Sequence, residues 1–509
     1  MTADKNNIPE FSELSLFEIG PKLSSFLPQD FCTSNHIALL DDPSDEGSQD
    51  IRIGVLDPED QDLISEAQEI IGKDIKPIQL NAYEISKALS QIYNIEAESV
   101  SGPILHLDSS LEINFSKDRK PNLILQDILS IALQRGSTDI HIENYNDDVD
   151  MRLRIDGTLH QITTSLSPSN IQRVIACLKM ACDLDHLERK KSQDGRFSAL
   201  YDDDGNSRRV DFRASIVPGN HGQEAVIRVL DPQRFILDID ELGMPTNILN
   251  SYKRIINHPN GLILTTGPTS SGKTSTLYAT VQSLVNRGLK IMTAEDPVEY
   301  EMDKVNQKSV NEFMNFSDYI RSFLRQNPDI ILVGEIRDAE TAEIAVKAST
   351  TGHLVLSSLH TSSAIGTVSR LRNLEIPDDY ISDNLLGAIG QRLVRKICEK
   401  CKEEQSHSDE MLSLFYNKKQ STKHYHGKGC ESCNGSGYKG MIGVYELFFP
   451  NEEISTAIST GTSVAQLRNM AKEQGFTPLI DNALDKVHEG ITSLEEISQR
   501  IGPKFPHAN

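Results

Sequence analysis

The segment from Gly267 to Thr274 reads Gly-Pro-Thr-Ser-Ser-Gly-Lys-Thr, which is the pattern of a phosphate-binding loop. An apolar run at 261–266 precedes it and apolar residues at helical spacing follow it, so the loop joins a predicted strand to a predicted helix. This arrangement directs main-chain N–H groups at a polyphosphate, with Lys273 reaching the β- and γ-phosphates and the Thr274 hydroxyl binding Mg²⁺. The predicted nucleotide-binding residues are Gly267, Pro268, Thr269, Ser270, Ser271, Gly272, Lys273, Thr274 and Ser275.

A second apolar run, 330–333, follows Asp329 and leads into Gly334 and Glu335. An ordinary second nucleotide element carries an Asp that organises Mg²⁺ after such a strand. This chain has Gly334 at that position, so Glu335 is the remaining acid. We predict that Glu335 holds Mg²⁺ through water or polarises the attacking water.

Acidic residues also cluster in Glu295-Asp-Pro-Val-Glu299, directly after a predicted strand that begins at Lys290. A site that hydrolyses a polyphosphate needs a carboxylate that orients water at the γ-phosphate. We predict Glu299 as this base and Glu295 as the second choice. The position of the cluster between the two nucleotide elements favours this function over that of a solvated loop.

Histidines and arginines are further candidates for contacts with phosphate. His353 and His360 flank a predicted strand, where they would sense the γ-phosphate or relay its loss; packing at the strand ends explains them equally well. An arginine stabilises the charge that develops during phosphoryl transfer. Arg196, Arg213 and Arg228 are candidates for that function, with surface ion pairs as the alternative.

Four of the seven cysteines form two C-x-x-C pairs with 28 residues between them. Four thiolates make a closed tetrahedral site that suits a structural Zn²⁺, whereas a redox dithiol is the alternative. Cys32, Cys177 and Cys182 are expected to be ordinary buried residues. The predicted zinc ligands are Cys398, Cys401, Cys430 and Cys433.

The chain of 509 residues has 74 acidic and 51 basic residues and a net charge of −23. Such a balance argues against general binding of nucleic acid and against direct docking on anionic lipid. No apolar run is long enough to span a membrane, and the first residues lack the apolar core of a signal peptide. We therefore expect a cytoplasmic protein.

Periodicity predicts several α/β regions and a helical tail. The first region has an expected strand at 51–56 and helices near 63–71 and 82–93, and the polar stretch 94–119 is expected to be a linker. Strands that alternate with helices after 236 predict a mainly parallel sheet covered on both faces. The predicted divisions are a partner-binding domain 1–110, a linker 111–119, an α/β domain 120–235, the nucleotide core 236–395, a four-Cys element 396–440 and a helical region 441–509.

Taken together, these motifs resemble the secretion ATPase superfamily of type II secretion and type IV pilus assembly. The segments that resemble its Walker A, Asp box, Walker B and His box are 267–274, 295–299, 334–338 and 351–361. Segments 137–143, 154–157 and 193–196 resemble its N-terminal subdomain, and the four cysteines resemble the zinc element of the type II secretion members. One departure is Gln223, where the family commonly has Glu.

The resemblance implies an α/β protein with a RecA-like P-loop core, a preceding PAS-like domain and a small N-terminal α/β domain. It also implies a hexamer that hydrolyses ATP with Mg²⁺, in which Arg196, Arg213 and Arg228 close over the nucleotide. Such an ATPase would power pseudopilus assembly and protein export in type II secretion. Residues 1–110 would bind the cytoplasmic part of an inner-membrane anchor protein, and the motor would act on a membrane platform protein.

Other functions fit parts of the pattern. A type IV pilus extension ATPase is the nearest alternative, whereas retraction ATPases are shorter and lack the cysteine insert. A DNA-stimulated RecA-like translocase is disfavoured by the net charge and by the absence of a basic stripe. A nucleotide-regulated scaffold that hardly hydrolyses ATP is disfavoured by Glu299 and Glu335.

Overall fold

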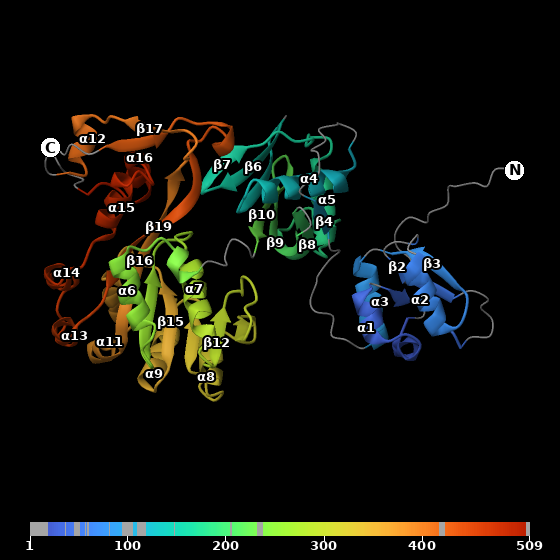
Figure 1. Ribbon diagram of the computed structural model, residues 1–509, viewed down its shortest axis with the longest axis horizontal. Helices are drawn as coiled ribbons and strands as arrows, with labels where there is room; N and C mark the ends of the chain where they lie inside the picture. The colour runs from blue at the N-terminus through green and yellow to red at the C-terminus, as the bar shows by residue number, and fades with distance from the viewer. Residues whose placement is uncertain are drawn as a thin grey trace. The chain divides into compact units, whose positions relative to one another are not determined.

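The computed structural model describes most of the chain in two compact units, Met1–Asp231 and Pro232–Asn509 (Figure 1). The described residues are 19–35, 37–44, 51–55, 58, 61–80, 82–93, 105–108, 119–146, 148–203, 206–231, 238–416 and 423–504.

The first unit begins with a small sheet in the order β1-β2-β3, in which β2 pairs antiparallel with β1 and parallel with β3. Aliphatic side chains of β2, such as Ile51 and Ile53, are fully buried against the helices. The predicted strand and both helices of this region are confirmed, although Leu56 lies outside the described residues. The elements are η2 (Pro21–Ser25), α1 (Gln29–Ser34), β1 (Ala38–Leu39), β2 (Ile51–Val55), α2 (Gln61–Ile71), β3 (Ile75–Gln79) and α3 (Ala82–Tyr93).

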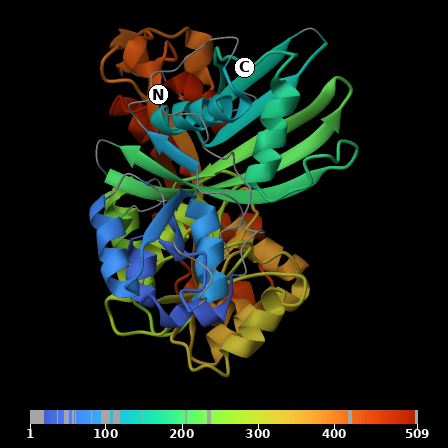
Figure 2. The same cartoon turned by 90° about the vertical axis from the view of Figure 1, so that its right-hand side faces the viewer.

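A second sheet of the first unit has seven strands in the order β4-β8-β9-β10-β5-β6-β7. Helices α4 and α5 cover one of its faces (Figure 2), where Phe197, Phe212 and Ile227 are buried. Since side chains alternate along a strand, the neighbouring residues lie on the other face. The elements are β4 (Leu105–Asp108), α4 (Pro121–Gln134), β5 (Asp139–Asn144), β6 (Val149–Ile155), β7 (Thr158–Gln161), α5 (Ile171–Ala181), β8 (Gln193–Asp203), β9 (Asn206–Gly219) and β10 (Gly222–Leu230).

The prediction that 94–119 is entirely a linker is wrong at β4. This strand pairs parallel with β8, with Leu105 opposite Ala199, and Leu107 is 2% exposed in the core. The short polar-apolar alternation was hidden among charged and small residues, and only pairing with a distant strand makes it a strand. Most of the remaining predicted linker lies outside the described residues.

The second unit is built on a sheet in the order β13-β12-β14-β15-β11-β16-β19. All of its pairings are parallel except the last, in which β19 runs antiparallel to β16, so the predicted mainly parallel sheet is confirmed. Its strands are β11 (Gly261–Thr266), β12 (Ile291–Glu295), β13 (Val305–Ser309), β14 (Ile330–Val333), β15 (Leu354–Leu359), β16 (Leu385–Ile397) and β19 (Tyr438–Phe448).

Helices cover both faces of this sheet (Figure 1), and a separate apolar core fills each side. Ile263 packs on one side with α6 and α7, while its neighbours Leu262 and Leu264 pack on the other with α8 and α9. Runs that are apolar at every position therefore make these central strands. The helices between Pro232 and the four-Cys element are η4 (Ile239–Glu241), α6 (Thr246–Ile255), α7 (Lys273–Val285), α8 (Phe316–Phe323), α9 (Ala339–Thr350), α10 (Gly366–Asn373) and α11 (Asp378–Asn384).

The four-Cys element leaves the sheet after β16 and returns to it in β19, so the predicted division at 440 falls inside a strand of the core sheet. The predicted helical region 441–509 is confirmed for the four helices between 452 and 500, whereas residues 441–448 belong to a strand of the core sheet. No helix among the described residues has the length and hydropathy needed to cross a membrane. The remaining elements are β17 (Lys402–Gln405), α12 (Asp409–Ser413), β18 (His424–Gly427), η5 (Glu431–Cys433), α13 (Glu452–Ser459), α14 (Val464–Glu473), α15 (Leu479–His488) and α16 (Leu494–Arg500).

Candidate active site at the carboxyl ends of the parallel strands

The phosphate-binding loop connects the carboxyl end of β11 to the first residue of α7. Gly267 and Gly272 have φ angles of 156° and 87°, which L side chains rarely adopt. A Cβ at Gly267 would also lie 2.5 Å from the Ser271 hydroxyl oxygen, so this glycine is needed for space as well as for conformation. The loop ends at a helix N-terminus, the position where main-chain N–H groups bind anions.

Lys273 is the first residue of α7, and its side chain curls back over the loop. Its Nζ donates to the carbonyl oxygens of Gly267 at 2.9 Å and Pro268 at 3.1 Å. Burial lowers the pKa of Lys273, and the charge of Arg392 lowers it further, while the charge of Glu335 opposes both. A cation that is partly desolvated in this way attracts phosphate more strongly than one in water.

Glu335 follows β14 and is contacted by two cationic or polar side chains. His360, which follows β15, has its Nε2 3.2 Å from Glu335 Oε2, and Arg337 donates to Glu335 Oε1. Burial by itself would raise the pKa of Glu335, but Arg337 and His360 together outweigh it and hold the pKa below its ordinary value. Glu335 is therefore ionised at neutral pH.

The two acids of the 295–299 segment lie in different surroundings. Glu295 is 4% exposed and accepts hydrogen bonds from Tyr278, Thr293 and Gln307, and its burial raises its pKa. Glu299 is half-buried, and its N–H donates to the Tyr278 hydroxyl at 3.1 Å. A carboxylate occupied by three donors is poorly placed to activate water, so the geometry disfavours Glu295 as the base.

The two predicted histidines lie at opposite ends of the strand β15. His360 follows the carboxyl end of β15, next to Glu335, whereas His353 precedes the amino end of the same strand. The Nδ1 of His353 lies 2.9 Å from the carbonyl oxygen of Ala348, near the last turn of α9. The structure thus separates His353 from the phosphate-binding loop by the length of β15, and the carbonyl contact favours the packing alternative for His353.

In the first unit, the three predicted arginines form one row across the second sheet. Arg196 pairs with Arg213, and Arg213 pairs with Arg228, at directly opposed positions of β8, β9 and β10. Their neighbours along each strand belong to the buried core, so all three lie on the face away from α4 and α5. The row continues to Asp139, which accepts from Arg228 at 3.3 Å. Such a row of guanidinium groups suits an anionic ligand.

Gln223, which departs from the family pattern, is turned away from that face. It is 5% exposed, and its main-chain N–H and carbonyl both bond to the Gln172 amide of α5 at 3.2 Å. Its own amide approaches the carbonyl of Glu188 at 3.5 Å. Gln223 therefore packs β10 against α5 in this unit.

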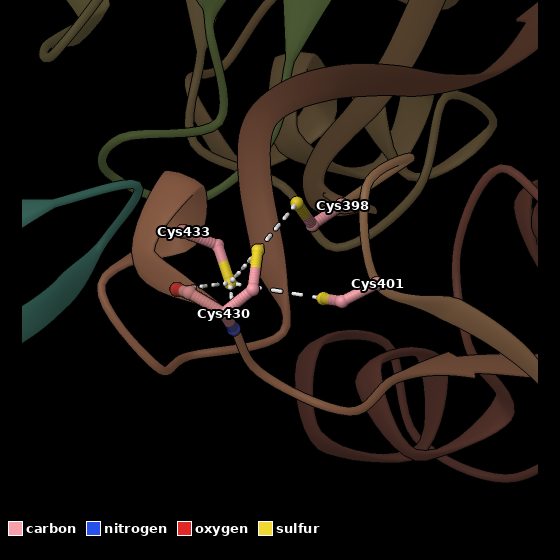
Figure 3. Close-up of side chains that lie close together, drawn as sticks. All are labelled: Cys398, Cys401, Cys430 and Cys433. Atoms are coloured by element: carbon pink, nitrogen blue, oxygen red, sulfur yellow. Dashed lines mark hydrogen bonds between the residues drawn. The ribbon is translucent and has the colours of Figure 1, made fainter.

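The four paired cysteines converge on one point, as Figure 3 shows. Their sulfur atoms all lie within 4.8 Å of one another, and three of the sulfur pairs are separated by 3.7, 3.8 and 3.9 Å. Sulfurs placed tetrahedrally about 2.3 Å from a single ion lie roughly 3.8 Å apart. The N–H groups of Cys430 and Gly437 donate to Cys433 Sγ at 3.1 and 3.3 Å, as expected for a thiolate ligand. The donor set thus fits a tetrahedral, four-thiolate metal site.

Comparison with known proteins identifies the family. Residues 116–499 match the model of the family described as "Type II/IV secretion system protein", and residues 9–99 match that of the "MshEN domain". The chain belongs to the type II/IV secretion system protein family. The predicted resemblance is confirmed, and the phosphate-binding loop and Glu335 lie within the matched residues.

Relatives of this secretion ATPase extend over nearly the whole chain. The type II secretion system ATPase E of Vibrio cholerae is 37% identical over 92% of this chain and 95% of its own length. The type IV pilus assembly ATPase PilB of Myxococcus xanthus is 33% identical over 96% of this chain and 88% of its own. The crystal structure of the pilus retraction motor PilT with bound ADP covers 74% of this chain and 96% of PilT, with a TM-score of 0.51 and 26% identity.

Three residues around the site of this secretion ATPase were not predicted from the sequence. Tyr278 on α7 bonds to both Glu295 and Glu299, and only its position one helical turn beyond Thr274 hinted at this. Gln391 and Arg392 lie on β16, far beyond the motifs, and no local pattern in the sequence marks them. Arg392 donates to the carbonyl oxygen of Ser362, in the segment that follows His360, at 3.3 Å.

Proposed function

We propose that this ATPase is the hexameric motor of type II secretion, which hydrolyses ATP to power pseudopilus assembly and protein export. The observation that carries the proposal is the meeting of Lys273, Glu335 and His360 at the carboxyl ends of three neighbouring parallel strands. A cation that binds the phosphates and an ionised carboxylate that holds Mg²⁺ or water are parts that ATP hydrolysis at a phosphate-binding loop uses, and the imidazole contacts that carboxylate.

The roles of these residues follow from their geometry. The loop and Lys273 bind the phosphates, and Thr274 and Glu335 would hold Mg²⁺, which supplies charge neutralisation when bound. Glu299, which is half-buried whereas Glu295 is almost fully buried, orients the attacking water. His360 contacts Glu335 and so responds to the loss of the γ-phosphate.

Arg196, Arg213 and Arg228 are proposed to close over the nucleotide from the first unit, in the same or a neighbouring subunit. Their shared row supports this role, because three adjacent guanidinium groups bind the spread charge of a polyphosphate better than isolated ones. Hydrolysis would release this contact and open the two units. The motion would then turn or push the inner-membrane platform protein.

Zn²⁺ is proposed as the ion of the four-Cys site. With four thiolates and no open coordination position, the site is structural and would hold the ends of β16 and β19 together. Residues 1–110, which include the match to the MshEN domain, would bind the cytoplasmic part of a membrane anchor protein. The protein would thus act in the cytoplasm at the inner membrane through protein partners.

The test of the motor model is ATP turnover at several protein concentrations, with the oligomer size recorded at each. We expect turnover per chain to rise as hexamers form and to be abolished by Lys273→Ala. Arg228→Ala should lower turnover without reducing hexamer formation. Turnover that is independent of assembly would refute the inter-subunit site, and an inactive hexamer in the presence of its membrane partners would favour a scaffold.

Type IV pilus extension is the second candidate, because PilB of Myxococcus xanthus matches nearly the whole chain. Deletion of this protein in its native cell separates the two functions. Loss of exported enzymes with intact pili supports type II secretion, whereas loss of pili with normal export supports the alternative.

A further inference from the structure

Gln391 is a buried polar residue of β16 that lies beside the phosphate-binding loop. The parallel register places Gly390 opposite Thr266, the last residue of β11, so Gln391 is level with Gly267 at the start of the loop. Its side chain is 1% exposed. An amide that is so deeply buried must be hydrogen-bonded or it destabilises the fold.

Both ends of the Gln391 amide bond to residues around the loop. Its Nε2 donates to the carbonyl oxygen of Ser271 at 2.8 Å, and its Oε1 accepts from the Thr276 hydroxyl at 2.9 Å. Ser271 is inside the loop and Thr276 is in the first turn of α7, and both are buried. A single side chain therefore ties the loop to the helix that follows it.

The two glycines that shape the loop also pack against Gln391. A Cβ at Gly267 would lie 2.6 Å from the Gln391 carbonyl oxygen, and a Cβ at Gly272 would lie 3.1 Å from its Nε2. The same carbonyl accepts from Arg392 at 2.9 Å, so it is held in place. Gln391 thus contacts the loop at its first glycine, its interior and its last glycine.

We propose that Gln391 is a positioning residue for ATP binding, which holds the phosphate-binding loop in the shape that accepts the phosphates. The side chain contacts the loop from behind, through a carbonyl and two glycines, and leaves the main-chain N–H groups free to bind anions. Hydrogen bonds that fix a loop before the ligand arrives lower the entropy lost on binding. The residue acts through the loop and does not touch the nucleotide.

The inference rests on the ATPase activity and goes beyond the four known motifs. Gln391 also lies on the strand that leads to Cys398, which is seven residues further along the chain and is the first cysteine of the proposed metal site. A general loss of structure after substitution would therefore show itself in the metal content. A variant that keeps its metal content therefore has a local defect at the loop and not a general loss of structure.

The test uses the full-length protein and compares Gln391→Met with Gln405→Met. Methionine matches glutamine in length and removes both hydrogen bonds. Gln405 is the control because it lies in the four-Cys element, where its amide donates to Glu495 of α16 and does not contact the phosphate-binding loop. We expect the KM for ATP and the dissociation constant of a fluorescent ATP analogue to rise about tenfold in Gln391→Met, the loss typical of a buried polar group left unpaired. The kcat at saturating ATP and the zinc content should change little, as uniform binding is lost. The melting temperature should fall slightly, because the buried Ser271 carbonyl and Thr276 hydroxyl lose this partner.

A second pair of variants keeps the proposal testable if Gln391→Met folds poorly. Thr276→Val removes one of the two bonds and Gln391→Glu keeps only the acceptor for Thr276, so each should raise the KM for ATP. Thr276→Val should add little to Gln391→Met, because the two residues share one interaction. An unchanged KM in folded variants overturns the proposal, as does a rise that always accompanies loss of zinc and of thermal stability.

Discussion

The phosphate-binding site and the four-Cys site are both built from segments distant in sequence, but they differ in how their polar groups are surrounded. At the cysteines, each ligand has sulfur neighbours at metal-site spacing, and main-chain N–H groups donate to Cys401 and Cys433. At the phosphate-binding site, Lys273 and Glu335 are only half-buried and contact groups that can exchange partners.

This difference separates a structural centre from a reactive one. A closed set of four thiolates leaves no position for a substrate, so its removal should affect folding. A half-buried cation and carboxylate keep their charges available, so their removal should affect chemistry. Substitutions at the two places should therefore break different properties of the protein.

Glu335→Gln is expected to have the largest effect. It removes the negative charge that His360 and Arg337 stabilise, and kcat should fall about a hundredfold or more with little change in melting temperature at neutral pH. ATP turnover with binding of a fluorescent ATP analogue measures this. Glu343→Gln, on an exposed pair with Lys347, is the matched control and should keep full turnover.

Cys430→Ser should impair metal binding and folding, and leave the chemistry of the phosphate-binding site intact. Loss of one thiolate should reduce the bound zinc from about one per chain to well below half, and lower the melting temperature of the second unit by about 5 °C or more. Metal analysis and calorimetry measure both. Cys177→Ser, at a half-buried position outside the cluster, is the control. A variant with full zinc content and reduced turnover would contradict the structural assignment.

The two histidines sharpen the comparison within a single strand. His360→Gln should lower kcat about tenfold, because a side chain that contacts Glu335 is lost. His353→Gln should lower only the melting temperature, since His353 contacts the Ala348 carbonyl at the opposite edge. Equal losses of turnover in the two variants would contradict the proposal that only the histidine beside Glu335 takes part in hydrolysis.

The smallest expected effect is a dependence of stability on pH. The pKa of Glu335 is lowered from its ordinary value of 4.5 in the folded protein, so its ion contacts stabilise the fold above that pH. The stability difference between the wild type and Glu335→Gln, about 1 kcal/mol or less for a partly exposed pair, should disappear as pH falls below 4.5 through the folded pKa. Denaturant unfolding at pH 7 and at successively lower pH measures the difference. A difference that persists at low pH would show that packing is responsible.

Sequence reasoning worked best where a motif is local and its chemistry dictates its form. The loop from Gly267 to Lys273 was recognisable because phosphate binding needs glycines and a cation at fixed spacing. The cysteine pairs were recognisable for the same reason. The strand β4 was missed, because four residues of weak alternation become a strand only when β8 pairs with them.

Tertiary structure was needed wherever a role depends on direction or burial. Spacing alone could not separate His360 from His353, since both flank β15; the parallel arrangement puts one at each edge of the sheet. Burial likewise separated Glu299 from Glu295, and strand register showed that Arg196, Arg213 and Arg228 form one row.

By itself, the sequence determined the family, the pattern of the phosphate-binding loop, the two cysteine pairs and the alternation of strands and helices, because each is encoded in neighbouring residues. Only the tertiary structure decided that Glu295 is buried while Glu299 is half-buried, that His360 contacts Glu335, and that Gln391 contacts the loop from a strand more than a hundred residues away. Those facts depend on contacts between segments distant in the chain, and no local pattern of residues records such contacts.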